Sequence, residues 1–255
     1  MKIVAIVQAR MGSTRLPGKM MMEILKKPIV GYVFDGLSRS STITESWLAT
    51  TTNKEDDVLA QWAELRAIRC FRGSSEDVLD RFYNVAKLGN ANVVVRITAD
   101  CPLVDPAVVD KIVSEFLSCG DCDYVSNTIE PTYPDGYDVE VFSVRALNKA
   151  WEDAKLSSER EHVTPYIKKH PEMFKSKNIR FTEDFSKYRC TLDNIEDFYL
   201  INKIIEECER KSIVCNLTNV LDFITRNPDW TAINDKFKRD EGYAKSLAED
   251  RIVKR

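Results

Sequence analysis

The sequence predicts an α/β protein of three layers, a mainly parallel sheet with helices on both faces. Strand-like and helix-like stretches alternate along the chain, which is the pattern of such a sheet. The runs 3–7 and 93–97 are short, continuous and rich in β-branched residues, as expected of strands buried on both faces. With 255 residues and no repeat or flexible linker, the chain predicts one domain over residues 1–228 and a peripheral helical segment, 229–255.

The individual elements follow from periodicity and from the residues that begin and end them. Asp105 and Pro106 begin the clearest helix and Gly120 ends it, because Asp caps, Pro fits the first turn and Gly closes. The other expected helices are 29–37, 55–66, 76–88, two stretches between 145 and 169, and 195–210; the other strands are 47–51, 68–71, 138–142, one near 179 and 189–192. The alternation changes beyond residue 124, so we expect residues 125–190 to elaborate the same domain.

Composition argues against several classes of protein. A net charge of −3 and a pI near 5.6 give no general attraction to nucleic acid or to an anionic membrane. The N-terminal apolar run ends at Gln8, too early for a signal-peptide core, and no stretch approaches the length of a membrane span. We therefore expect a cytoplasmic protein with neither nucleic acid nor membrane as partner.

The cysteines do not indicate a disulfide framework. There are seven, an odd number in a chain of this length. Cys119 and Cys122 form a C-x-x-C motif, but no second pair at zinc-site spacing accompanies it. We expect reduced, packed thiols at these positions.

The loop after the first strand predicts a polyphosphate site. It carries three charges, all positive: Arg10, Arg15 and Lys19. Gly12 and Gly18 allow the backbone to approach a ligand closely. Backbone N–H groups and fixed cations at the carboxyl end of a strand are how α/β proteins hold phosphates. The alternative is a surface loop with scattered cations.

The loop is not an ATPase P-loop. Five residues, instead of four, separate Gly12 from Gly18, and Met20 stands where a hydroxyl would ligate magnesium. The order Ala9-Arg10-Met11-Gly12-Ser13-Thr14-Arg15-Leu16-Pro17-Gly18-Lys19 resembles the N-terminal signature of cytidylyltransferases that activate sugar acids, such as 3-deoxy-manno-octulosonate cytidylyltransferase. It is nearer still to their SpsF-like relatives from spore-coat polysaccharide pathways.

This resemblance implies a glycosyltransferase-A-like nucleotidyltransferase fold, magnesium dependence and a homodimer. It places the loop around the triphosphate of CTP, with Arg10, Ser13 and Lys19 on phosphate. The nucleotide-binding positions that we expect are Ala9, Arg10, Gly12, Ser13, Arg15, Lys19, Gly73, Arg81 and Thr98. Gly73 would present backbone to the ribose, Arg81 would reach base or phosphate, and Thr98 matches a family position at the base edge. A lone helical arginine is also commonly a solvated residue.

Two carboxylates are candidates for holding Mg²⁺. Asp100 directly follows the buried strand 93–97, at the sheet edge that the first loop faces, and hard oxygens are the ligands that magnesium prefers. Asp193 lies just before the helix 195–210, in a run that resembles the family's V-D-T-P-E-D-L segment, whose first Asp is the second magnesium ligand. Asn194 and Ile195 depart from that pattern. Glu196 and Asp197 are expected only to complement the helix N-terminus.

The acceptor side is less clearly marked. Asp138, Glu140 and Phe142 alternate along a strand and share one face, where half-buried acids need partners such as sugar hydroxyls, an amino group or cations. Glu161 and His162 match the Glu-Gln pair that touches sugar in the octulosonate enzymes, the alternative being a salt-bridged helix face. A sugar carboxylate could be met by magnesium, Arg160 or Arg145. Acids around one histidine suit hydroxyls better than a sugar phosphate.

The sequence thus predicts CMP transfer from CTP to the anomeric hydroxyl of a 2-keto-3-deoxy sugar acid, with release of pyrophosphate. Asp100, Arg10 and Lys19 would be the catalytic residues, the two cations stabilising the departing pyrophosphate. One alternative is a nucleotidyltransferase that acts on a sugar or polyol phosphate. Another is a nucleotide-sugar-dependent glycosyltransferase, against which the lack of an Asp-x-Asp at residues 98–100 argues. A non-enzymatic nucleotide-binding module would not need the second carboxylate.

Overall fold

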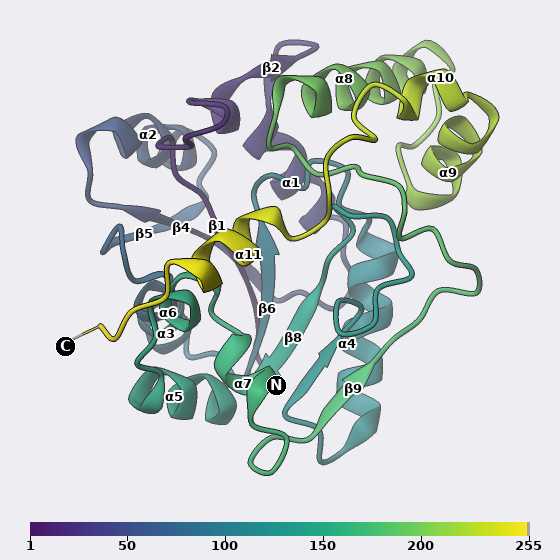
Figure 1. Ribbon diagram of the computed structural model, residues 1–255. Helices are drawn as coiled ribbons and strands as arrows, with labels where there is room; N and C mark the ends of the chain where they lie inside the picture. Colours follow the sequence, from purple (N-terminus) through teal and green to yellow (C-terminus); the bar gives the residue numbers. More distant parts are fainter. Residues whose placement is uncertain (254–255) are drawn as a thin grey trace.

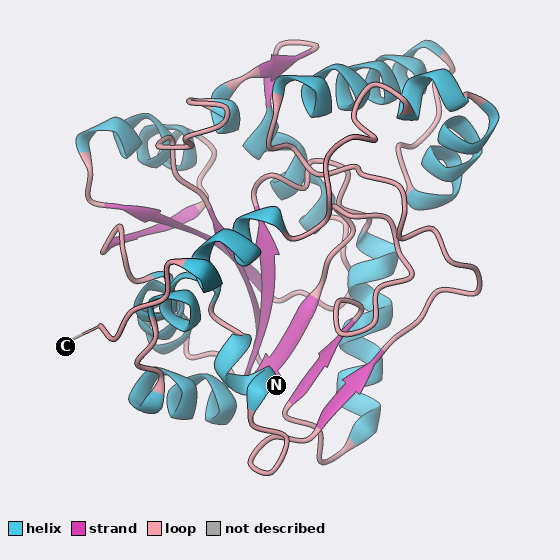
Figure 2. Ribbon diagram, viewed as in Figure 1, coloured by secondary structure: helices cyan, strands magenta, loops and turns pink. Residues whose placement is uncertain are grey.

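The computed structural model describes residues 1–253 and confirms the predicted α/β class. A seven-stranded sheet in the order β5-β4-β1-β6-β8-β7-β9 forms the middle layer (Figures 1 and 2). Its strands are β1 (Ile3–Gln8), β4 (Glu45–Thr51), β5 (Arg69–Gly73), β6 (Val93–Thr98), β7 (Tyr124–Ser126), β8 (Glu140–Ser143) and β9 (Ser176–Asn178). Only β8 runs antiparallel to its neighbours, β6 and β7. A separate small hairpin pairs β2 (Glu23–Ile24) with β3 (Lys27–Pro28).

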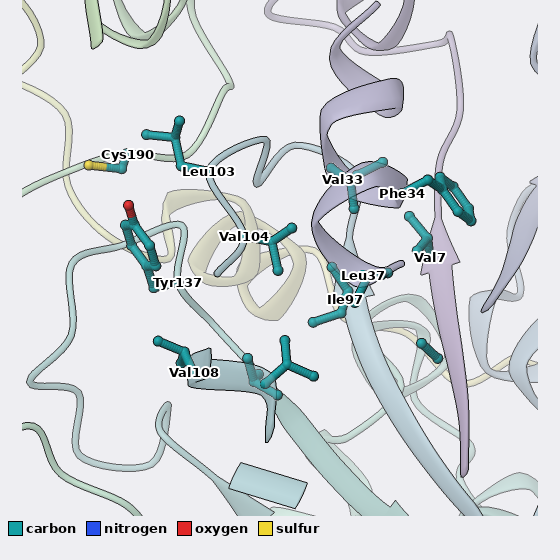
Figure 3. Packing of buried hydrophobic residues seen from close by; sticks show 14 of the residues in the cluster. Val7, Val33, Phe34, Leu37, Ile97, Leu103, Val104, Val108, Tyr137 and Cys190 are labelled. Carbon is teal, nitrogen blue, oxygen red and sulfur yellow. The ribbon is translucent and has the colours of Figure 1, made fainter. Parts of the chain in front are cut away.

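Helices cover both faces because successive side chains of the buried strands point in opposite directions. On one face, Ala5 and Val7 of β1 belong to a core shared with α1 (Ile29–Leu37), α2 (Asp57–Leu65), α4 (Pro106–Cys119), α8 (Ile195–Arg210) and α9 (Leu217–Arg226). On the other, Val4 and Ile6 pack with α3 (Val78–Leu88), α5 (Val144–Asp153) and α7 (Pro165–Lys169). Figure 3 shows Val7 of β1 in the first of these cores. Two buried faces explain the continuous apolar runs of β1 and β6.

Most expected elements are present, and the helices 29–37 and 195–210 have the predicted bounds. The chain between 144 and 169 forms three short helices, α5, α6 (Ser157–His162) and α7, rather than two. Residues 189–192 form no strand; Arg189 makes only an isolated bridge to Asp135. The 3-10 turns η1 (Lys19–Met21) and η2 (Lys54–Asp56) complete the N-terminal half. No helix within residues 1–253 is both long and apolar enough to cross a membrane.

The prediction for the C-x-x-C pair was wrong. Cys119 and Cys122 are joined by a disulfide, with their Cα atoms 5.6 Å apart. The reason is local: Gly120 ends α4 with a positive φ of 77°, and the Asp121 N–H donates to the Cys119 carbonyl O at 2.9 Å. The five remaining cysteines are free.

The C-terminal segment, expected at the periphery, lies on the surface and crosses the site. After α10 (Pro228–Thr231), the chain crosses the carboxyl ends of the sheet strands, and α11 (Glu241–Ala248) lies in front of them (Figure 1). Few apolar residues hold this segment in place; polar contacts hold it. Asn234 is 2% exposed and donates to the Asp197 carboxylate at 2.8 Å. Arg239 pairs with Asp138, and Asp250 accepts from the Ser158 hydroxyl at 2.8 Å.

Candidate active site

Three separate segments converge on the ammonium of Lys19. Gly18, with φ of 75°, adopts a left-handed conformation that turns the loop into η1 and directs Lys19 inward. Lys19 is 6% exposed, and its Nζ donates to Asp100 Oδ2 at 3.0 Å, Asp193 Oδ1 at 3.0 Å and the Leu192 carbonyl O at 2.6 Å. Three site residues predicted from the sequence therefore form one cluster at the carboxyl edge of the sheet.

The cluster is held in its charged form. Burial opposes the charge of Lys19, but Asp100 and Asp193 outweigh burial and raise the pKa of the ammonium. Burial likewise opposes the charge of Asp193, yet Lys19, Arg15 and Arg189 together lower the pKa of that carboxyl. Arg15 Nη2 lies 2.8 Å from Asp193 Oδ1, and Arg189 Nη2 lies 2.8 Å from Asp193 Oδ2. The loop thus supplies two cations that face one carboxylate.

The oxygens around Lys19 fit a magnesium site. Asp100, Asp193 and the Leu192 carbonyl already surround one cation with hard oxygen atoms. Mg²⁺ is commonly bound by one or two carboxylates together with phosphate oxygens. Two acids that lie on opposite sides of a cation, next to a loop of phosphate-binding character, satisfy that requirement. Asp100 and Asp193 are therefore the residues that could hold the metal.

Arg189 is a residue of this site that sequence reasoning missed. It is 7% exposed and bonds three carboxylates, those of Asp135, Asp193 and Asp197, at 2.8–2.9 Å. Asp197 in turn accepts from the backbone N–H groups of Asp193 and Asn194, both at 2.9 Å, and so caps α8. The helix-terminal role expected for Asp197 is confirmed, and the same bonds fix Asp193. The only signal in the sequence was an arginine four residues before Asp193.

Asp56, a second residue that sequence reasoning missed, holds the loop after β1 by hydrogen bonds. Asp56 is fully buried, and its carboxylate accepts the Met11 N–H at 2.6 Å and the Thr51 hydroxyl. The Met11 carbonyl O accepts from the N–H groups of both Ser13 and Gly18, at 2.8 and 3.0 Å. These bonds fix the backbone of the loop on both sides of Gly12. No charge pattern near residue 56 marks this role in the sequence.

The residues predicted to lie around the base and the ribose are partly buried. Arg81, expected to reach a ligand, is 2% exposed and donates to the Ala49 carbonyl O at 3.1 Å. Burial and the nearby Arg10 lower its pKa to about 10. A Cβ at Gly73 would lie 2.8 Å from Arg81 Cγ, so Gly73 makes room for the arginine stem. Arg81 therefore supports the strand ends from beneath, because α3 packs it under β4 and β5.

The remaining positions of this side lie around the same edge. Ala9 donates its N–H to the Ala49 carbonyl O at 3.2 Å, and Thr98 Oγ1 lies 3.2 Å from Cys101 Sγ. Arg10 is half-exposed, with its Nη2 at 3.7 Å from Glu161 Oε1. Nucleotide contacts at Ala9, Gly12, Ser13, Gly73 and Thr98 stay predictions.

On the acceptor side, Glu161 and His162 lie together at the end of α6. The Ser246 hydroxyl of α11 donates to Glu161 Oε2 at 2.8 Å and lies 3.0 Å from His162 Nε2. The His162 ring also meets the Tyr243 ring edge-on, with centroids 4.9 Å apart. Burial, helped by the positive charge of Arg96, lowers the pKa of His162 to about 4, so the imidazole is neutral at neutral pH.

Glu140 and Phe142 are not available to a substrate, contrary to prediction. Antiparallel pairing places Glu140 opposite Arg96, with which it forms an ion pair, and it also accepts from the hydroxyls of Tyr124 and Thr164 at 2.5 and 2.6 Å. Burial opposes its charge, but Arg96 leads the groups that lower its pKa to about 2. Phe142 is fully buried in the core beneath α5 and α7. The two residues do share one strand face, but helices cover that face.

The other residues predicted on the acceptor side form ion pairs within the chain. Asp138 is partly exposed and pairs with Arg239 of the C-terminal segment. Arg160 is 2% exposed and holds Asp77, and Arg145 pairs with Asp123. Both of these arginines are engaged away from the Lys19 cluster, so neither is placed to meet a sugar carboxylate.

Comparison with known proteins identifies the family. A family model described as cytidylyltransferase matches residues 4–223. The chain belongs to the cytidylyltransferase family. It is 37% identical to the uncharacterized protein MJ1063 of Methanocaldococcus jannaschii, over 94% of this chain and 97% of that protein. It is 31% identical to the spore coat polysaccharide biosynthesis protein SpsF of Bacillus subtilis, over 89% and 95% of the two chains.

Two further similarities are to proteins that are themselves named cytidylyltransferases. The 3-deoxy-manno-octulosonate cytidylyltransferase of Trichlorobacter lovleyi is 35% identical over 117 residues, 46% of each protein. The solved structure of a cytidylyltransferase from Leptospira borgpetersenii superposes with a TM-score of 0.85 at 33% identity, covering 91% of this chain and 97% of that one. The predicted fold and the predicted nucleotidyltransferase activity are both confirmed by these likenesses.

Proposed function

We propose that this cytidylyltransferase transfers CMP from CTP to the anomeric hydroxyl of a 2-keto-3-deoxy sugar acid, for surface polysaccharide or glycoconjugate synthesis. The observation that carries the proposal is the cluster in which Lys19 lies between Asp100 and Asp193 beside Arg15. It brings cations for a triphosphate and carboxylates for a metal to one point at the sheet edge. The name of the 3-deoxy-manno-octulosonate cytidylyltransferase supports a sugar-acid acceptor, and the name of the spore coat polysaccharide biosynthesis protein supports a polysaccharide pathway.

In this proposal the chain's own groups bind and orient the triphosphate. Arg10, Arg15 and Lys19 lie on or beside the loop and would face the β- and γ-phosphates. The acceptor hydroxyl gives up its proton to water as its oxygen forms a bond to the α-phosphorus, and the bond from that phosphorus to the bridging oxygen breaks, so that pyrophosphate leaves with its electron pair. Lys19 and Arg10 would stabilise the charge on the leaving group. Asp100 and Asp193 would hold Mg²⁺, which when bound neutralises phosphate charge and lowers the pKa of a hydroxyl.

The acceptor side supports a ligand rich in hydroxyl groups. Glu161 offers a carboxylate, neutral His162 a ring nitrogen, and Asp138 a second carboxylate. A phosphorylated acceptor would bring a dianion toward these acids and would be repelled. We also propose a homodimer, as the resemblance to the octulosonate enzymes implies, which light scattering would test.

The test is a pyrophosphate-release screen of CTP, UTP, ATP and GTP against sugar acids and sugar phosphates. We expect release with CTP and a 2-keto-3-deoxy sugar acid, dependent on added Mg²⁺. Release with a sugar 1-phosphate or polyol phosphate, and none with any sugar acid, would contradict the proposed acceptor. Release with another nucleotide at the same kcat/KM would contradict selectivity for CTP.

A further inference from the structure

The helix α11 lies over the site although it buries no residue of its own. We define the strap as residues 240–249, which comprise α11 and one residue on each side. Arg239 fixes the chain before it through Asp138, and Asp250 fixes the chain after it through the backbone N–H and hydroxyl of Ser158, at 3.0 and 2.8 Å. The strap is thus held at both ends, while its contacts in between are polar and shallow. Such a segment opens locally at a low free-energy cost.

One contact of the strap falls on the nucleotide loop. Glu241 Oε2 lies 3.4 Å from Arg15 Nη1, and the same arginine reaches Asp193 at 2.8 Å through Nη2. Both partners of the Glu241–Arg15 pair are more than a third exposed, so water screens the attraction and the pair is weak. The Glu241 carboxylate is thus paired with the Arg15 guanidinium, which the proposed function assigns to a phosphate group.

A second contact falls on the acceptor side. The Ser246 hydroxyl gives its proton to Glu161 at 2.8 Å, and the Gly242 carbonyl O, its other acceptor, is farther at 3.1 Å. With that proton used, a bond from His162 at 3.0 Å requires Nε2–H to donate to Ser246 Oγ. Glu161 and His162 together therefore form one acceptor and one donor that fit a single hydroxyl group.

Resting on the proposed function, we propose that the strap competes with both substrates. Glu241 takes the place of a phosphate on Arg15, and Ser246 takes the place of a sugar hydroxyl between Glu161 and His162. Because Glu241 and Ser246 are five residues, or about 1.4 turns, apart on one helix, displacement at either end loosens the other. The strap must then leave the site before turnover, and its departure is favoured by a triphosphate more than by a monophosphate.

Hydrogen exchange of the strap amides tests displacement without any need for turnover. The full chain is compared alone, with CMP, with CTP and with inorganic tripolyphosphate, each with Mg²⁺. We expect the amides of 241–248 to exchange at least about fivefold faster with CTP or tripolyphosphate than with CMP. Unchanged or slower exchange with CTP would overturn the proposal, because the strap would then stay in place or close on the ligand.

Kinetics separates the two contacts. Glu241→Gln should lower the KM for CTP about threefold, and Ser246→Ala should lower the KM for the acceptor by about as much; because the two ends are coupled, each variant should lower the other KM by a smaller factor. Glu249→Gln, which removes an exposed acid from the same segment, is the matched control and should change neither. Raised KM values or a reduced kcat in the first two variants would show that the strap helps to build the site, and would overturn the proposal. If no acceptor releases pyrophosphate, the proposed function fails, while exchange with tripolyphosphate still decides whether the strap is displaced.

Discussion

The phosphate side and the acceptor side of this site are built differently. The phosphate side is an ionic cluster in which Lys19 and Arg15 of the first loop face Asp100 and Asp193. The acceptor side joins the neutral His162 and Glu161 of a short helix to a hydroxyl of the C-terminal segment. Under the proposed function, charge would fix the reacting phosphates, whereas hydrogen bonds that are easily exchanged would select the acceptor.

The largest effect is expected at the two carboxylates. Asp100→Asn and Asp193→Asn should each lower kcat/KM by about a thousandfold or more, because under the proposed function each removes a charge that would hold the metal at the reacting centre. Steady-state pyrophosphate release measures the loss. Asp229→Asn, at an exposed acid of α10, is the control and should keep full activity. A folded Asp100 or Asp193 variant that retains a tenth of the wild-type rate would refute its assignment.

The next effect separates triphosphate from monophosphate. Lys19→Ala should weaken CTP binding by about 10- to 100-fold and CMP binding much less, because the ammonium is assigned to the β- and γ-phosphates. Calorimetric titration of both nucleotides measures the two losses. The variant leaves Asp100 and Asp193 without their shared cation, so its thermal unfolding should be recorded as well. Equal losses for CTP and CMP would place Lys19 elsewhere.

On the acceptor side the expected losses are smaller. Glu161→Gln and His162→Ala should raise the acceptor KM by about tenfold, with little change in the KM for CTP, since each removes one hydrogen bond to a hydroxyl. Initial rates with either substrate varied would measure both constants. A rise in the KM for CTP that equals the rise for the acceptor would contradict the division of the site into two sides.

The smallest effect is on stability and depends on pH. The pKa of His162 is about 4 in the folded chain and near 6.5 for an ordinary histidine, so the unfolded chain binds the extra proton between these values. Folding stability from this residue is complete above pH 6.5 and is lost as the pH falls toward 4. His162→Gln should therefore be less destabilised than wild type between pH 6.5 and 5, by about 1–2 kcal/mol in urea unfolding. A His162→Gln curve that runs parallel to the wild-type curve would contradict the lowered pKa of His162.

The same comparison explains what could be predicted from the sequence. Lys19 and Asp100 directly follow the loop and the strand that position them, so a motif at a strand end was enough to place both. Asp193 needed the resemblance, because its segment forms no strand. Arg189 and Asp56 act through buried hydrogen bonds whose partners are distant in sequence, and no local pattern records such bonds.

The errors have physical causes of the same kind. The alternation of polar and apolar residues correctly placed Glu140 and Phe142 on one strand face. It could not show that α5 and α7 cover that face. The strap has few apolar positions, so periodicity gave no reason to bring it across the site. Polar contacts with Asp138, Glu161 and Arg15 hold it there. These contacts appear only once the chain is folded.

The central claim is that Asp100 and Asp193 jointly hold the divalent metal of the nucleotide complex. Mn²⁺, titrated in place of Mg²⁺ in the presence of CTP and followed by electron paramagnetic resonance, tests it without turnover. We predict that either Asp→Asn variant binds Mn²⁺ at least about tenfold more weakly than wild type, while Asp229→Asn binds it equally well. Wild-type Mn²⁺ affinity in both Asp100→Asn and Asp193→Asn would contradict the account.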